Sequence, residues 1–419
     1  MDWHEVGHEG VSLGIEKSVV ALGVARMADA VANSMLIVTL PLYIAAGSDR
    51  ILGLSTSAET GIVLATFGVV SAFLQPIAGR LSDLAGRRRA FVLGGLFALA
   101  GFNFLYSVAS GFWLLLALRL GQGASAAFTI TASIALVNEL SDASARGGNM
   151  GVFNALRLVG FGVGPLLAGF VLSAGPYHVL GLEIGGYQMV FYLATLGALV
   201  GAAMVALLVR EPVHTSADVG DVEVHMHGSG GRALDPIFTL GVATFVMAAC
   251  IALLASIEPR VNARLDQDAR WFGIQFAVFI FSVALCQPFL GRASDHWGRK
   301  PFVVVGLLLL APTTLAQGLV VTPVQMVIAR IAQGVSGAMV FAPALALAGD
   351  LVVEGQSGAQ LAVVTMAFGL GLSGGQLSSG FLVRWGFVVP FAVGGALALC
   401  AAALVQREVD EPERIQPNT

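Results

Sequence analysis

The chain has 419 residues, of which 56% are hydrophobic and only 11% are charged. Soluble domains carry about 25% charged residues, so this chain has too few charges to cover its apolar surface in water, and it is too apolar to be disordered. Cys250, Cys286 and Cys400 all lie within apolar runs, which excludes a secreted disulfide scaffold. The net charge of −4 offers no basic surface to nucleic acid. We therefore expect a membrane protein surrounded by the lipid bilayer.

Twelve apolar runs are long enough to cross a membrane. A helix needs about 20 residues to span a hydrocarbon core about 30 Å thick. The polar N-terminus lacks the basic start and cleavage site of a signal peptide, so we expect the first run to stay in the mature protein. The predicted transmembrane helices are, in chain order, 18–45, 57–79, 89–109, 112–138, 147–174, 187–209, 234–257, 271–291, 300–320, 323–349, 358–383 and 386–406.

The Lys and Arg residues predict the orientation, because loops on the cytoplasmic side carry an excess of them. With both termini in the cytoplasm, 13 lie inside and five outside, and four fall within spans. The inside set is 17, 80, 87, 88, 89, 146, 210, 232, 292, 299, 300, 407 and 414, and the outside set is 50, 260, 264, 270 and 384. We therefore expect a multi-pass protein of the cell membrane with cytoplasmic N- and C-termini.

The chain repeats itself after about 211 residues. The segment QPIAGRLSDLAGRRR at 75–89 recurs as QPFLGRASDHWGRK at 287–300, and the Arg119 region recurs around Arg330. Glu139 likewise matches Asp350. Parallel repeats of this kind are typical of secondary transporters, whose substrate site lies at the bilayer midplane between the halves. Gene duplication also builds membrane proteins that transport nothing, so that alternative stays open.

The repeat predicts the domain organisation. Two six-helix bundles, 18–209 and 234–406, are joined by a hydrophilic linker at 210–233, and polar tails at 1–17 and 407–419 flank them. The linker carries three histidines among acidic residues, at 214, 225 and 227. Such a group can bind a divalent metal, but it is more typical of a solvated linker. We expect neither a metal site nor a cofactor.

The repeated motif resembles the loop signature of the major facilitator superfamily. The positions that match the superfamily pattern are Gly79, Asp83, Gly86, Arg87 and Arg88 in the first copy, and Gly291, Asp295, Gly298 and Arg299 in the second. The second copy has Ala293 where leucine is usual. The resemblance implies an all-α membrane protein with twelve transmembrane helices in two six-helix pseudo-symmetric halves.

Finer motifs are similar to those of the twelve-span drug–proton antiporters. Arg119 and the Gln-Gly pair that follows it resemble the second motif of that group. The antiporter motif of the fifth span is matched by Gly160, Gly164, Pro165 and Gly169, with Ala168 in place of one glycine. Asp29-Ala30 and Leu40-Pro41 resemble the first-span motif of tetracycline-type antiporters, although Val38 replaces a usual proline.

The loop motif also has a physical explanation. Gly79 and Gly86 permit close backbone approach and tight turning at the membrane surface. Asp83 can pair with a nearby arginine, and the resemblance implies that Asp83 and Arg87 lock the cytoplasmic side against a neighbouring helix. Glu139 and Arg146, in the loop after the fourth span, are the expected partners.

Charges inside the spans are the strongest functional candidates, since each costs about 2.5–3.5 kcal/mol at the membrane centre. Asp29 and Arg157 both lie about 15 Å into their helices, near the midplane. Arg26 is one turn before Asp29, and we expect its side chain to extend toward the cytoplasm. We expect Asp29 to gain and lose a proton, with Arg119 and Arg157 as the other proton-coupling residues. A purely structural ion pair is the alternative.

These features predict a proton-coupled antiporter, working as a monomer, that exports small amphipathic or drug-like molecules by alternating access. The alternative is an importer or facilitator of a small polar or anionic solute, which Arg157 favours. An enzyme is disfavoured, because no span contains a histidine and Asp29 is the one deeply placed aspartate. Candidate substrate contacts are Asn33, Gln275, Phe276, Phe279 and Gln317.

Overall fold

Long apolar helices make up nearly all of the chain. The computed structural model describes residues 17–47, 53–141, 145–179, 181–211, 233–351 and 357–411. The helices of the first half are α1 (Lys17–Ala46), α2 (Thr56–Ala85), α3 (Arg88–Leu105), α4 (Phe112–Leu140), α5 (Arg146–Ala174) and α6 (Gly186–Leu208). Those of the second half are α7 (Pro236–Ala252), η1 (Ala255–Ile257), α8 (Glu258–Leu265), α9 (Ala269–Trp297), α10 (Arg299–Leu319), α11 (Pro323–Asp350), α12 (Ser357–Leu382), η2 (Val383–Trp385) and α13 (Val389–Glu408).

The twelve-helix prediction is confirmed. Within the described residues, 11 helical stretches are long and apolar enough to cross a membrane, with α7 through α8 taken as one, and α12 occupies the place of the remaining span. Large apolar side chains such as Phe73, Leu207 and Phe289 are exposed on these helices. Such a surface is expected where the surrounding solvent is lipid.

One predicted span is broken rather than continuous. The predicted helix at 234–257 is α7, followed by the short turn η1 and the separate helix α8. Pro259 lies in the first turn of α8, where its missing N–H costs nothing, whereas it could not continue the hydrogen bonds of a helix that started at Pro236. The span therefore bends before Glu258 and extends beyond its predicted end.

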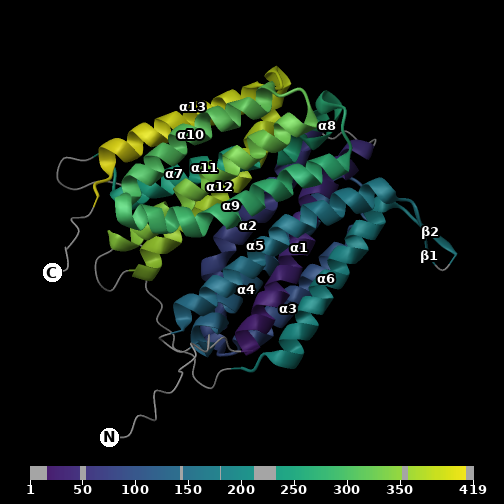
Figure 1. Cartoon of the computed structure of the whole chain (residues 1–419). Coiled ribbons are helices and arrows are strands. Elements are labelled where there is room, and N and C mark those ends of the chain that lie inside the picture. Colours follow the sequence, from purple (N-terminus) through teal and green to yellow (C-terminus); the bar gives the residue numbers. More distant parts are fainter. Residues whose placement is uncertain are drawn as a thin grey trace, which may run out of the picture.

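A small β-hairpin between α5 and α6 was not predicted. Strand β1 (Tyr177–Val179) pairs antiparallel with β2 (Leu182–Ile184), and the turn contains Gly181 at φ 80°. We call the end of the molecule that carries this hairpin the hairpin side. The opposite end, where α1 starts and α13 ends, is called the terminal side (Figure 1).

The two halves lie side by side and meet along two pairs of helices (Figure 1). Helix α5 of the first half packs against α9, and α2 packs against α12. Each half has its own apolar core, and a further core cluster at the hairpin side includes residues of both halves, such as Leu36 and Ile257. The halves are therefore joined most closely at the hairpin side.

Glycines on the contact faces show where the halves separate. On α2, a Cβ at Gly61 would lie 2.7 Å from the carbonyl oxygen of Gln376 in α12. Gly79 lies about five turns farther along the same face of α2, yet a Cβ there would meet nothing within 4 Å. The expected close approach at Gly79 is therefore wrong for this state of the protein, because the halves have diverged at the terminal side.

The same spacing recurs on the other pair of helices. On α9, a Cβ at Gly273 would lie 3.0 Å from the carbonyl carbon of Pro165, while Gly291, about five turns away, faces open space. On α5, Gly169 abuts Ala269, while Gly151 on the same face touches nothing. The molecule is thus closed at the hairpin side and open at the terminal side.

The predicted tails and linker fall mainly outside the described residues. Residues 1–16, 212–232 and 412–419 are not described, and these include the linker histidines. Within the part of the chain that is described, no three His, Cys, Asp or Glu side chains come together as metal ligands.

Candidate functional site

An ion pair lies at the centre of the first half. Arg26 and Asp29, one turn apart on α1, pair through a guanidinium nitrogen and a carboxylate oxygen. They are only 8% and 5% exposed. The expectation that Arg26 extends to the cytoplasmic surface is therefore wrong: a buried carboxylate three residues away offers a partner, so the arginine stays beside it.

Glycines of the antiporter motif bring α5 against this part of α1. A Cβ at Gly160 would lie 2.9 Å from the Cβ of Ala30, and one at Gly164 would lie 3.2 Å from the backbone nitrogen of Met35. The Ser34 hydroxyl also reaches the Gly160 carbonyl at 3.4 Å. Only glycine permits this approach, so the motif fixes the distance between α1 and α5.

Arg157 lies one turn before Gly160 on α5. Its side chain is half-buried, and its guanidinium carbon lies 5.8 Å from the centre of the Phe161 ring. The positive charge of Arg26 is close enough to repel it. The strongly exposed apolar residues Leu167 and Phe170 are on a different face of α5. Among the described residues no Asp or Glu forms an ion pair with Arg157. The carboxylate of Asp29 is paired with Arg26 instead.

The repeat mates Arg119 and Arg330 occupy equivalent places inside their own halves. Each donates a hydrogen bond to the glutamine three residues later, Gln122 at 3.1 Å and Gln333 at 2.6 Å. Arg119 is 2% exposed and Arg330 is 0% exposed. Both are therefore packed within a half rather than between the halves.

The surroundings of Arg330 explain several predicted substrate contacts. The rings of Phe276 and Phe279 lie 4.8 and 4.4 Å from its guanidinium carbon, and the Gln275 carbonyl accepts a hydrogen bond from it. Gln317 is also buried, with an oxygen that has no partner in the described part of the chain. These four residues support the interior of the second half in this state, whereas Asn33 is half-buried on α1.

The first loop motif forms an ion-pair network with a different arginine from the one predicted. Arg88 pairs with both Asp83 and Glu139, joining the end of α2 to α4. Arg87 is exposed just before α3 begins, and Arg146 is exposed at the start of α5. The prediction that Arg87 acts with Asp83 is therefore not met here, because the first residue of α3, not the residue before it, points into the space between the helices.

The second motif repeats this network, as the repeat predicts. Arg299 pairs with Asp295 and with Asp350, the mates of Asp83 and Glu139. Gly86 and Gly298, the turn glycines, have φ values of 58° and 101°, a conformation that favours glycine. Each network lies within one half.

Two further carboxylates complete these networks and were missed. Glu211 accepts a hydrogen bond from the backbone N–H of Arg89 at 3.1 Å. Glu411 accepts hydrogen bonds from the backbone N–H groups of Arg299 at 2.7 Å and of Lys300 at 2.8 Å. They satisfy N–H groups at the starts of α3 and α10, whose N-cap residues make no side-chain capping hydrogen bond. A Glu-Pro pair after the last span of each half, at 211–212 and 411–412, was the available sequence indication.

Glu258 is a second buried carboxylate that the sequence prediction placed in an outer loop. It begins α8, is 0% exposed and receives a distant hydrogen bond of 3.5 Å from Asn262. Its Oε2 has no partner within the described residues. Tyr187 of the first half is close enough to feel its charge.

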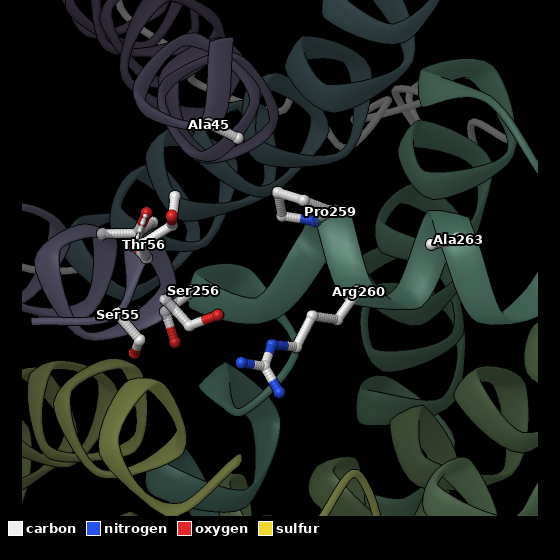
Figure 2. Close-up of a pocket in the computed structure, with 9 residues that line it drawn as sticks. Ala45, Ser55, Thr56, Ser256, Pro259, Arg260 and Ala263 are labelled. Carbon is white, nitrogen blue, oxygen red and sulfur yellow. Dashed lines mark hydrogen bonds between the residues drawn. The ribbon is translucent and has the colours of Figure 1, made fainter. Parts of the chain in front are cut away.

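A cavity of about 370 Å³ lies between the halves on the hairpin side. Figure 2 shows the Arg260 side chain of α8 beside Ser256, with Ser55 and Thr56 at the start of α2 across the cavity. Arg260 itself donates a hydrogen bond to the Val383 carbonyl at 3.2 Å. None of the predicted coupling residues lines this cavity.

Several known proteins are similar to parts of this chain. Multidrug resistance protein 2 of Bacillus subtilis (strain 168) is 28% identical over 158 residues, which are 38% of this chain and 40% of that protein. The quinolone resistance protein NorA of Staphylococcus aureus (strain Mu50 / ATCC 700699) is 25% identical over 178 residues, 42% of this chain and 41% of NorA. The chain thus aligns with less than half the length of these curated relatives.

Solved structures share the fold over almost the whole chain. The xylose transporter XylE from E. coli, solved in an inward open conformation, has a TM-score of 0.72 and 14% identity, and the match covers 95% of this chain and 97% of XylE. The family model of the Major Facilitator Superfamily matches residues 22–239 and again residues 240–419. The chain, matched in both of its halves, belongs to the Major Facilitator Superfamily.

Proposed function

We propose that the protein is a secondary active transporter that exports small amphipathic molecules in exchange for protons by alternating access. The observation that carries this proposal is the buried Asp29 on α1. A carboxylate at mid-membrane depth is costly and is kept where it serves ion or proton movement. The names of the multidrug and quinolone resistance relatives support export of drug-like molecules.

Asp29 can exchange a proton only when its ion pair with Arg26 loosens. Beside Arg26 the ionised carboxylate is favoured, and away from it burial favours the protonated form. Helix α5 contacts α1 through glycines that face small side chains such as Ala30 and Ser34, so a small sliding motion between the helices can change the surroundings of Asp29. Arg119 and Arg157 are the cations that would act with Asp29 in the first half.

The excess of Lys and Arg at the terminal side supports an orientation with that side in the cytoplasm. The state described above would then be open to the cytoplasm and closed to the outside. In this state an exporter takes up its substrate, and it releases a proton to the cytoplasm. The opposite state would close the glycine faces at the terminal side and open those at the hairpin side.

The test is transport of a fluorescent quinolone by purified protein in liposomes with an imposed pH gradient. Asp29→Asn is expected to abolish gradient-driven accumulation, since an amide cannot release a proton, but to keep exchange of quinolone without a gradient. Asp268→Asn, at a half-buried aspartate that caps the start of α9 and pairs with Arg270, is the matched control and should behave as wild type, since asparagine also caps helices. Undiminished gradient-driven accumulation by Asp29→Asn would refute the coupling role.

A further inference from the structure

We infer that the molecule bound at the centre of this transporter carries an anionic group, a carboxylate or sulfonate, which pairs with Arg157. The inference rests on the proposed transport function and specifies its substrate class. Its basis is a charge imbalance around a half-buried arginine that has no partner of its own.

The charges near the centre of the first half do not cancel. Arg26 and Arg157 supply two positive charges, and Asp29 supplies one negative charge. The carboxylate of Asp29 is already paired with Arg26. Among the described residues no carboxylate reaches Arg157, and none of its nitrogens makes a hydrogen bond to a described group. One positive charge is therefore left over in a region where an isolated charge costs several kcal/mol.

The charge of a bound ligand decides whether it lowers or raises the electrostatic energy of this site. An anion lowers the net charge from +1 to zero and gives the guanidinium the paired acceptor that it lacks. A neutral ligand leaves the excess charge in place. A cation raises the charge to +2 while Asp29 is ionised, and so the site disfavours it.

Arg157 is less enclosed than the other arginines within the spans of the two halves. It is half-buried, whereas Arg119 and Arg330 are fully enclosed in their own halves. It lies on a different face of α5 from Leu167 and Phe170, the strongly exposed apolar residues. The Phe161 ring beside its guanidinium offers an apolar surface next to the charge. This combination suits an organic anion with a flat apolar body.

The experiment compares three ligands that share a ring system and differ in charge: naphthoate, naphthamide and naphthylmethylammonium. Their affinities for the purified protein in lipid nanodiscs are measured by calorimetry at equilibrium. We expect naphthoate to bind at least about tenfold tighter than naphthamide, the usual strength of one hydrogen bond to a charged group, and the ammonium compound to bind weakest. Equal or tighter binding of the amide or the ammonium compound would overturn the inference.

Variants identify the residue responsible. Arg157→Gln should remove the preference for naphthoate, Arg157→Lys should keep most of it, and the exposed control Arg270→Gln should leave it unchanged. Should Arg157→Gln fail to fold, the ligand series on the wild type and on Arg157→Lys still decides. Binding is repeated in chloride and in gluconate: weaker naphthoate binding in chloride supports an anion site shared with inorganic ions, whereas absence of naphthoate binding in both buffers overturns the inference.

The two proposals fail in different experiments. Equilibrium binding needs no pH gradient, so the charge preference is measured independently of proton coupling. If Asp29 does not couple transport to protons, Asp29→Asn would show undiminished gradient-driven transport, and the preference for naphthoate would be unchanged.

Discussion

The paired glycines on α9 allow the two conformational states to be shifted in opposite directions. Gly273 touches α5 at the hairpin side, and Gly291 lies on the same face with open space around it. Gly273→Ala introduces a methyl group 3.0 Å from the carbonyl carbon of Pro165 and 3.4 Å from the Cα of Leu166. These are backbone atoms, which cannot rotate away, so the helices must separate.

The size of the effect follows from the cost of overpacking. An extra methyl group forced into a close contact costs about 1–3 kcal/mol, which shifts an equilibrium by about 5- to 150-fold. Gly273→Ala should therefore deplete the state that is closed at the hairpin side by this factor. Gly291→Ala meets nothing here but would collide if the terminal side closed, so it should enrich the same state. Any gain in helix propensity is shared by both variants and cancels in the comparison.

The assay is electron–electron distance measurement between spin labels on α5 and α9. Labels at Gly147→Cys and Trp297→Cys, both exposed at the terminal side, are placed in protein whose three native cysteines are replaced. Gly273→Ala should increase the short-distance population, and Gly291→Ala should increase the long one. Identical distance distributions for the two variants would refute the argument from glycine contacts.

Two further predictions concern stability in detergent, measured by thermal unfolding. Arg88→Gln should destabilise the protein by about 3–5 kcal/mol, because it leaves the carboxylates of Asp83 and Glu139 without their cation. The control Arg87→Gln, at an exposed position, should change stability by less than about 0.5 kcal/mol. Equal effects of the two substitutions would contradict the assignment of Arg88. Glu258→Gln should leave stability unchanged or raise it, because it removes a charge that is buried without a cation among the described residues. A loss of more than about 1 kcal/mol in that variant would indicate that the ionised carboxylate is a stabilising group.

The repeat carried most of what the sequence could predict. It matched Arg119 with Arg330 and Glu139 with Asp350, and in the structure each member of a pair has one partner that corresponds to its mate's: the glutamine three residues later for the arginines, and Arg88 or Arg299 for the carboxylates. Such correspondences survive because the two halves are packed alike. The helix count followed with them, since span length depends only on the thickness of the bilayer.

Other features depend on information that a sequence pattern does not hold. Arg87 and Arg88 are adjacent and chemically identical, and only the exact start of α3 decides which one points toward Glu139. Whether Gly79 is in contact depends on the conformational state, not on the residue. Glu258 lay just beyond the predicted span 234–257, whereas in the structure it begins the separate helix α8.

The ion-pair networks have a consequence for the speed of the conformational change. Every ion pair named above joins residues of the same half, so rocking one half against the other from this state separates none of them. What must part at the hairpin side are apolar contacts, including those of the cluster that contains Leu36 and Ile257, and close contacts between small residues and carbonyl groups, as at Gly61 and Gly273. Such contacts are short-ranged and insensitive to dissolved salt. The barrier to leaving this state should therefore be nearly independent of ionic strength, even though each half carries a dense cluster of charges at its terminal side.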